Sequence, residues 1–250
     1  SFSFSKRHLT NRLIHTSNST LNIKQFNNLG LECKELVVYG SNFSSTLKYP
    51  KFSSRIRDLC SIPTKLDSII LGVLLSDGWL YKNKSNKTLL AFKQTNFEYL
   101  WFVYTKFSHY CRSLPKIAKT QINGKKFFSF VFATRVYPCF TEWYNLFYSS
   151  GKKRVPLDLY NRIDYEALAH WIMGDGTKSY KGITLQTQSF TIPECVFIIS
   201  VLIHKFGLNC NIHMQRNQPT IYIKSKSVKK IKPYILPYMC SSMKYKLYVD

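Results

Sequence analysis

The chain has 250 residues, of which 36 are Lys or Arg and only 13 are Asp or Glu, so its formal net charge is +23. Hydrophobic residues make up 45%, which argues against a disordered chain and is sufficient for one large or two small domains. No apolar run reaches the ~18 residues that a membrane span requires. This positive charge favours a polyanionic partner, with nucleic acid as the first candidate and an anionic membrane surface as the second.

The N-terminal segment has a composition of its own. Its first 31 residues contain no acid and are rich in Ser, Thr and Asn with scattered Arg and Lys. This composition is typical either of a targeting segment or of a basic, partly ordered arm. Both interpretations stay open for residues 1–40, which we treat as separate from the fold.

An apolar run that ends in a small residue, an Asp and a Gly occurs twice. Residues 70–78 are ILGVLLSDG, and residues 168–176 are LAHWIMGDG. Each run predicts a helix that stops at the glycine. Each is followed by a strand pattern, a helix pattern (residues 97–109 and 192–206), a hairpin signal (Asn123-Gly124, and Asn217 to Pro219) and a lysine. The sequence therefore predicts two repeats, residues 41–160 and 161–250, each an α+β unit with helices on one face of an antiparallel sheet.

The Asp at the end of each run, Asp77 or Asp175, is the candidate chemical group. The C-terminus of a helix disfavours a carboxylate, so an Asp placed there twice, at matching positions, needs a compensating charge. Taken singly, either residue could be a solvated Asp in a turn. Taken together, they predict two inward carboxylates that share divalent metal, because Mg²⁺ prefers oxygen ligands and can activate water for phosphodiester cleavage.

The two motifs, with the strings LLSDGWL, ALAHWIMGDGTK, LQTQSFT and HMQRNQPTIYI, resemble the double-motif, monomeric LAGLIDADG homing endonucleases that organellar group I introns encode. The resemblance implies two pseudo-symmetric αββαββα repeats that form a saddle, with antiparallel sheets in the major groove of a long, asymmetric DNA site. It also implies a monomer, hydrolysis of both strands to a staggered break, no membrane, and a mitochondrial location. Expected cofactors are Mg²⁺ or Mn²⁺, with Ca²⁺ binding without supporting cleavage.

Position by position, the resemblance makes Asp77 and Asp175 the metal-binding acids, joined by the carbonyl groups of Ser76 and Gly174. It assigns stabilisation of the scissile phosphate to Lys153 and Lys246. The polar residue that orders water corresponds to Gln94 or the adjacent Lys93 in the first repeat. In the second repeat it corresponds to Gln215 or Gln188. The third motif position is His170 in the second copy, where the family has a small residue, and we expect His170 to be a packing residue.

DNA contacts are expected from two groups of residues. Groove-facing candidates are polar or cationic residues of the strands and their turns: Lys93, Arg135, Gln186, Gln188, Arg216, Asn217, Lys224 and Lys226. Lysines expected to contact phosphates are Lys82, Lys84, Lys87, Lys125, Lys126, Lys229 and Lys230. Recurrent aromatic residues such as Trp79 and Trp101 are interpreted as core.

Three function classes remain open. The first is the metal-dependent DNA endonuclease, which the retention of both Asp residues favours. The second is an RNA maturase of the same fold, a splicing cofactor for group I intron RNA that does not need the two Asp residues. The third is a structural basic protein of an organellar ribonucleoprotein.

Overall fold

The computed structural model describes residues 37–38, 43–122, 124–149 and 151–248. Of the predicted arm, only Val37 and Val38 are described; they form strand β1 and pair with β2 (Phe43–Ser44), and the rest of residues 1–40 lies outside the described residues. In this part of the chain no helix combines the length and the apolar character that crossing a membrane requires.

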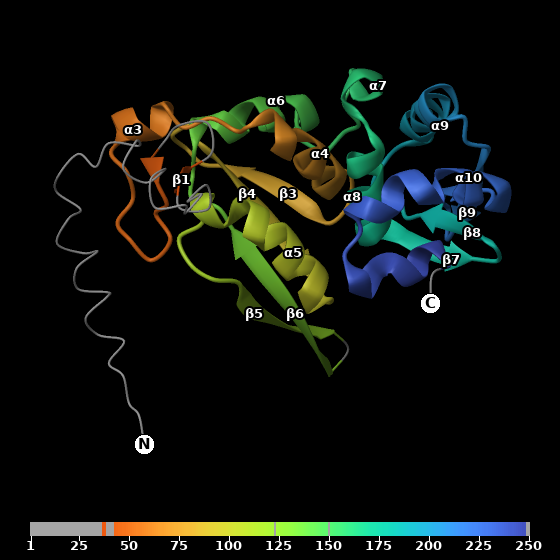
Figure 1. Ribbon diagram of the computed structural model, residues 1–250, viewed down its shortest axis with the longest axis horizontal. Coiled ribbons are helices and arrows are strands. Elements are labelled where there is room, and N and C mark those ends of the chain that lie inside the picture. The colour runs from red at the N-terminus through yellow and green to blue at the C-terminus, as the bar shows by residue number, and fades with distance from the viewer. Residues whose placement is uncertain (1–36, 39–42, 123, 150, 249–250) are drawn as a thin grey trace, which may run out of the picture.

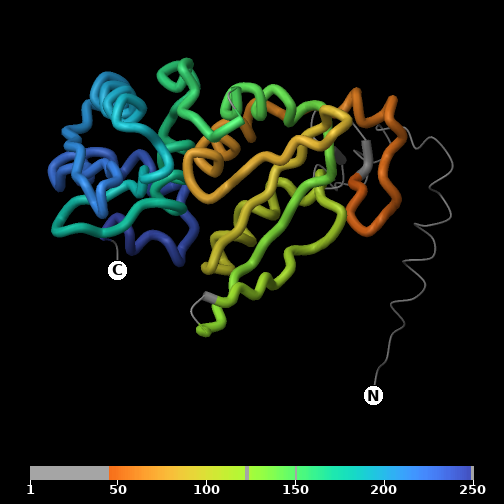
Figure 2. The backbone as a smooth tube through the Cα atoms, turned by 180° about the vertical axis from the view of Figure 1, so that it is seen from behind, coloured from red at the N-terminus to blue at the C-terminus, as the bar shows by residue number. Residues whose placement is uncertain are grey.

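Two halves follow the same order of helix, two strands, helix, two strands and helix. The first half contains α4 (Asp67–Leu75), β3 (Gly78–Lys82), β4 (Thr88–Gln94), α5 (Phe97–Phe107), β5 (Lys116–Ile122), β6 (Lys125–Ala133) and α6 (Thr141–Phe147). The second half contains α8 (Tyr165–Asp175), β7 (Gly176–Ser179), β8 (Gly182–Leu185), α9 (Ile192–Phe206), β9 (Cys210–Gln215), β10 (Gln218–Ile223) and α10 (Ser225–Ile235). The predicted pair of αββαββα repeats is confirmed, and the halves lie side by side (Figures 1 and 2).

Short helices complete the chain. Helix α3 (Ser54–Asp58) precedes the first half, and α7 (Leu159–Arg162) connects the halves, so the boundary predicted after residue 160 falls inside α7. Short 3-10 helices cover residues 64–66, 108–110, 138–140, 236–238 and 241–247.

Each half contains one antiparallel four-stranded sheet. The strand orders are β3-β4-β6-β5 and β7-β8-β10-β9, so the two sheets have the same topology. Helices α5 and α6 pack on one face of the first sheet, and α9 and α10 on one face of the second. Side chains alternate accordingly: Leu80 is buried beneath the helices, whereas Trp79 and Tyr81 project from the opposite face and are exposed. We call this opposite face of each sheet its open face.

Two-residue turns close the outer hairpin of each half. Gly124 supplies the positive φ in the first hairpin, as the Asn-Gly signal predicts. In the second hairpin the turn residues are Arg216 and Asn217, with φ of 50° and 61°. The turn therefore lies one residue earlier than the Asn217–Pro219 signal indicates, and Pro219 is inside β10.

The C-terminal ends of α4 and α8 cross at the centre of the molecule, between the sheets (Figure 1). The helices approach so closely that a Cβ on Gly72 would lie 2.5 Å from the Cβ of His170, and one on Gly174 would lie 2.4 Å from the Oγ of Ser76. At each of these motif positions, the third and the seventh, one helix carries glycine and the other a larger residue. His170 is fully buried, so its prediction as a packing residue is confirmed.

This complementarity is testable by exchanging the residues of one pair. We expect Gly174→Ala to lower the free energy of unfolding by about 1–3 kcal/mol, because the added methyl overlaps Ser76. The double variant Ser76→Gly/Gly174→Ala should recover most of the loss, since it moves the larger residue to the other helix. Urea denaturation of both single variants and the double variant gives the coupling between the positions. Strictly additive effects would contradict the proposed contact.

Candidate active site at the crossing of the two motif helices

The two carboxylates lie where the motif helices end. Asp175 is the last residue of α8 and directly precedes β7, while Asp77 lies between the end of α4 and the start of β3. The glycine after Asp175 is required by close packing: a Cβ on Gly176 would lie 2.5 Å from the carbonyl oxygen of Ile172. The chain therefore passes directly from helix to strand, which leaves each Asp at the central crossing.

The carboxylates of Asp77 and Asp175 are close enough to affect each other. Burial raises the pKa of Asp175 to about 7, and the negative charge of Asp77 adds to this rise. Burial also raises the pKa of Asp77, although a hydrogen bond from Gln94 and the charges of two lysines oppose the rise. The site thus holds two carboxylates whose ionised forms repel each other, which is the situation that a bound cation relieves.

Lys153 and Lys246 supply the positive charge. The ammonium of Lys153 donates to the carbonyl oxygens of Ser76 (2.8 Å) and Gly78 (2.9 Å). The ammonium of Lys246 donates to three consecutive carbonyls at the end of α8, those of Ile172, Met173 and Gly174. Each lysine therefore neutralises the negative end of one motif helix, where a carboxylate would otherwise be unfavourable.

The titration of the lysines reflects both their burial and the nearby acids. Burial lowers the pKa of Lys153 to about 8, while the charges of Asp175 and Asp77 act in the opposite direction. Burial also lowers the pKa of Lys246, which is 7% exposed. The sequence predicted both lysines as phosphate-stabilising residues; their hydrogen bonds add a second role in holding the helix ends.

The two halves of the site differ in the uncharged side chain at the position next to the aspartate. The Gln94 amide donates to Oδ2 of Asp77 at 2.5 Å, which supports its predicted place in the site. Strand pairing places Phe92 opposite Gly78 and Leu185 opposite Gly176, so the position equivalent to Gln94 in the second half is Thr187. Thr187 is fully buried, and its hydroxyl donates to the carbonyl of Pro219. No hydrogen bond joins Gln215 to Asp175 in the described part of the chain.

Several predicted DNA-contacting residues lie on or beside the open faces. Lys93 projects from the first open face, and Gln186 and Gln188 lie on the second. The remaining members of this group are exposed in the turns between strands, as Lys84, Arg216 and Asn217 are, or at the start of β6, as Lys125 and Lys126 are. Gln215 and Gln188 line one shallow hollow together with Arg216 and Gln218.

Other predicted contacts are placed elsewhere. The Arg135 guanidinium donates to Thr46 and to the carbonyl of Tyr49, so it ties the segment before α3 to the fold rather than facing a groove. Lys82 is on the helix-covered face, over the ring of Tyr144. The remaining members lie outside the open faces: Lys87 beside Ser54 and Asp58, Lys224 at the junction of β10 and α10, and Lys226, Lys229 and Lys230 on α10.

Some open-face residues were missed or misassigned. Trp79 was interpreted as core, but it is 37% exposed on the open face of the first sheet. The exposed side chains of Thr177, Asn211 and His213 on the second open face were not predicted. The strict alternation of strand side chains was the signal that could have found them, had the strand registers been fixed by a local pattern.

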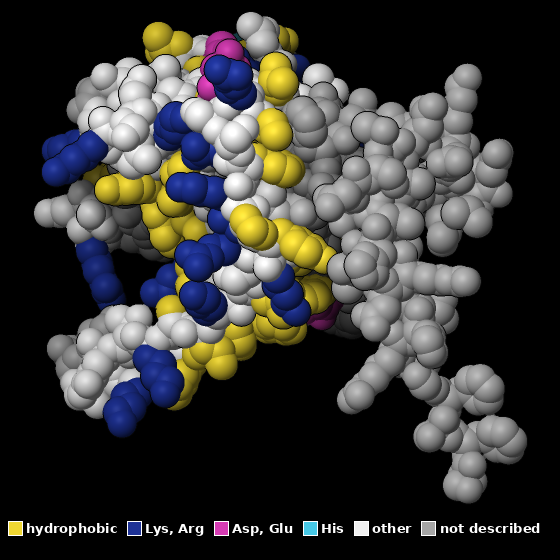
Figure 3. Space-filling view, turned by 90° about the vertical axis from the view of Figure 1, so that its left-hand side faces the viewer, with side chains coloured by type: hydrophobic (Ala, Val, Ile, Leu, Met, Phe, Trp, Pro, Cys, Tyr) yellow, Lys and Arg dark blue, Asp and Glu magenta, His cyan; other side chains and the backbone are white. Residues whose placement is uncertain are grey.

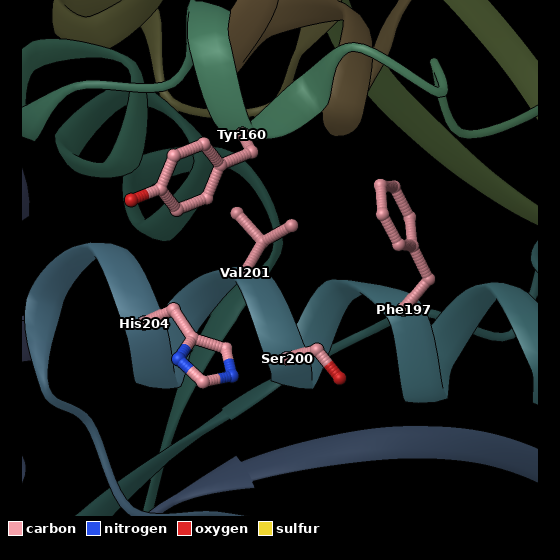
Figure 4. A pocket seen from close by; sticks show the side chains of 5 residues that line it. All are labelled: Tyr160, Phe197, Ser200, Val201 and His204. Carbon is pink, nitrogen blue, oxygen red and sulfur yellow. The ribbon is translucent and has the colours of Figure 1, made fainter.

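A second concave feature lies between α7 and α9. Tyr160 of α7 and Phe197, Ser200, Val201 and His204 of α9 line it (Figure 4). It contains none of the acids or lysines described above, so we do not assign the chemistry to it.

The residues at the crossing fit a divalent cation. Among the described residues no group of three or more His, Cys, Asp or Glu side chains converges on one point, so only Asp77 and Asp175 supply carboxylates. A hard cation such as Mg²⁺ commonly takes one or two carboxylates and completes its shell with carbonyls, water and substrate phosphates. The carbonyl oxygens of Ser76 and Gly174 each accept from one lysine and retain a second lone pair.

Comparison with known proteins agrees with the fold and with the two motifs described above. Residues 67–231, more than half of the chain, match the sequence model of the LAGLIDADG DNA endonuclease family. The chain belongs to this family. The chain is similar to the cytochrome b mRNA maturase bI2 of Debaryomyces hansenii, with 37% identity over 193 residues that cover 72% of each chain. A probable intron-encoded endonuclease 1 of Wickerhamomyces canadensis is 32% identical over 191 residues, covering 72% of this chain and 83% of that protein.

The structure of this chain is also similar to a solved structure of the homing endonuclease I-WcaI bound to its DNA recognition sequence. The TM-score is 0.72 at 30% sequence identity, and the match covers 76% of this chain and 88% of the other. The predicted family and fold are thereby confirmed.

The raised pKa of Asp175 leads to a prediction about metal and pH. Its carboxyl has an ordinary pKa of 3.8 and a pKa of about 7 in the folded protein. Between these values the folded state binds more protons than the unfolded chain, so this group lowers stability as pH rises towards 7. A cation relieves the repulsion only when the carboxyl is ionised. We therefore expect Mg²⁺, at about ten times its dissociation constant, to raise the Tm by about 3–6 °C at pH 8 and by much less at pH 6.

Thermal scans at matched ionic strength, with K⁺ replacing Mg²⁺, separate this effect from screening. The Asp77→Asn/Asp175→Asn variant should lose the Mg²⁺-dependent shift. An equal shift in that variant would show that the cation binds elsewhere.

Proposed function

We propose that the protein is a site-specific endonuclease that hydrolyses both strands of duplex DNA with a divalent cation, Mg²⁺ or Mn²⁺, and leaves a staggered break. The observation that carries the proposal is the convergence of Asp77 and Asp175 at the crossing of α4 and α8, with a lysine beside each. The match to a DNA-bound homing endonuclease at a TM-score of 0.72 supports it.

In the proposed reaction, Asp77 and Asp175, with the carbonyls of Ser76 and Gly174, would hold the cation. When bound, such an ion polarises a scissile phosphate and lowers the pKa of a coordinated water. We expect Ca²⁺ to bind at the same ligands without supporting cleavage.

The other groups prepare this site. The Gln94 amide orients the Asp77 carboxylate and favours its ionised form through its hydrogen bond, against the rise in pKa that burial causes. Lys153 and Lys246 bring two positive charges to a place where a phosphodiester would add negative charge, and their hydrogen bonds to the helix ends preorganise them. Because both motifs belong to one chain, we propose that a monomer supplies the complete site.

The charge distribution supports a DNA partner. The first half presents Lys and Arg side chains between hydrophobic ones at the outer end of the molecule, with acidic side chains at few places (Figure 3). Lys116 lies on the edge strand β5, and Lys125 and Lys126 begin β6 at the hairpin. Such residues neutralise phosphates and make binding steeply dependent on salt. The names of the intron-encoded relatives further support a mitochondrial location.

The decisive test uses isosteric variants of the carboxylates. Asp77→Asn and Asp175→Asn should each reduce double-strand cleavage by at least 100-fold, because each removes a cation ligand of the shared site. Duplex affinity should change little, since the open faces are untouched. The substrate is a plasmid library that carries intron-insertion-type sites, and sequencing of the ends locates the break.

Ser68→Ala is a useful control, because Ser68 donates to Asp164 near the start of the motif helices and is remote from the Asp pair. Undiminished double-strand cleavage by either Asn variant would refute the assignment of these carboxylates.

A second candidate function is binding of a group I intron RNA as a splicing cofactor. The observation that favours it is α10, whose exposed residues include Lys226, Lys229 and Lys230 and which packs on the helix-covered side of the second sheet. No acidic residue occurs in α10. A cationic helix that faces away from the open faces remains available to a second polyanion while DNA is bound.

Substitution of these lysines separates the two partners. We expect Lys226→Glu/Lys229→Glu to weaken binding of a structured group I intron RNA by more than tenfold at low salt, because each change replaces a positive charge by a negative one. Affinity for duplex DNA should stay within about threefold. Filter binding of both nucleic acids at several salt concentrations measures this, and equal losses for RNA and DNA would place both on one surface.

A further inference from the structure

The second open face carries a set of uncharged polar groups. Its members are Thr177, Gln186, Gln188, Asn211, Gln215 and Gln218, from β7, β9, β10 and the loop after β8. The stacked rings of His213 and Tyr222, with centroids 5.1 Å apart, lie among them. No Lys or Arg lies on this face within the described strands; the cation Arg216 is at the hairpin turn.

Hydrogen bonds join two glutamines on this face to each other and to a threonine. The Gln188 amide donates to Oε1 of Gln186 at 2.6 Å, and the Gln186 amide donates to the hydroxyl of Thr177 at 3.2 Å. This chain of hydrogen bonds fixes the orientation of both amides before any partner binds. A glutamine amide offers one acceptor and two donors, which is the set that pairs with N6 and N7 of adenine in the major groove.

The exposed side chains of the first open face are mostly hydrophobic. Trp79, Tyr81 and Phe127 are 37%, 58% and 50% exposed there. Strand pairing sets Tyr81 beside Leu89, and sets Val131 between two lysines, Lys93 and Lys116. The side chains of Phe127, Leu89 and Val131 have no hydrogen-bonding group for base edges, but they can contact the C5-methyl group of thymine.

We propose that the two halves of the DNA site are recognised by different chemistry. The half on the β7–β10 sheet is recognised through amide hydrogen bonds to adenine bases, and the half on the β3–β6 sheet through apolar contact with thymine methyl groups. The proposal rests on the proposed function, because it requires both open faces to contact one duplex. It assigns the specificity of one half to Gln186 and Gln188, and that of the other to Leu89 and Val131.

The test begins from a random pool of duplexes, so the target sequence is itself a result. Duplexes that bind the full chain are selected from this pool without Mg²⁺, so that none is cleaved. In the selected site, 7-deazaadenine then replaces adenine, which removes the N7 acceptor, or uracil replaces thymine, which removes the methyl group. Each replacement is made in one half-site at a time. We expect 7-deazaadenine to weaken binding about tenfold in one half only, and uracil to weaken it about fourfold per contacted methyl in the other.

Two variants assign each half-site to its sheet. Gln186→Ala should bind the selected site more weakly and show no further loss with 7-deazaadenine, because the contact is already absent. Val131→Ala should likewise lose its response to uracil. Gln121→Ala is the matched control, since Gln121 is a glutamine of β5 that alternates to the other side from Val131, and it should keep both responses.

The outcomes are distinct. Equal losses in both half-sites for both analogues, or a 7-deazaadenine penalty that persists in Gln186→Ala, would overturn the division of chemistry while leaving DNA binding intact. Selection of no duplex at all would overturn the proposed function as well.

Discussion

The placement of two carboxylates at the C-terminal ends of two helices that touch is the constraint on which the rest of the molecule depends. A helix C-terminus disfavours negative charge, and two like charges in one place disfavour each other. Lys153 and Lys246 offset both effects, because each donates to the carbonyls of one helix end while its charge acts on both carboxylates. The pKa of Asp175 nevertheless remains raised to about 7, chiefly because its carboxyl is buried.

The close approach of the motif helices explains why these charges meet. At 2.4–2.5 Å, a Cβ on Gly72 or Gly174 would overlap atoms of the other helix. Glycine on one side of each contact lets the backbones approach and brings both helix ends, with their acids, to one point. Two exact copies of the motif would carry identical residues at each pair. In one chain the copies have diverged, so that His170 fills the space beside Gly72, and Ser76 fills the space beside Gly174.

The sequence predicted the elements well where a local pattern was strong. The two apolar runs, the helix at residues 192–206 and the Asn-Gly hairpin all carry signals that do not depend on distant residues. The residues that contact the two aspartates were harder to predict, because their positions depend on strand register. Gln94 was found through its family position, but Gln215 was assigned to the same role although strand pairing gives the equivalent position to Thr187. Arg135 has the charge of a DNA-contacting residue, yet its contacts with the segment before α3 join residues 86 and 89 apart in the chain, which no local pattern reveals.

The same divergence makes the two halves differ in the contacts of their aspartates and in the surfaces of their sheets, as well as in packing. Gln94 gives Asp77 an amide donor, whereas Thr187 donates its hydroxyl to Pro219 and leaves Asp175 with burial and charge alone. The sheets differ as well, since the first open face presents aromatic and aliphatic side chains with lysines among them, and the second presents oriented amides. A dimer of identical subunits would have to use one chemistry on both sides of a symmetric partner. A single chain with two related halves is free of that restriction, and its two faces are suited to an asymmetric duplex.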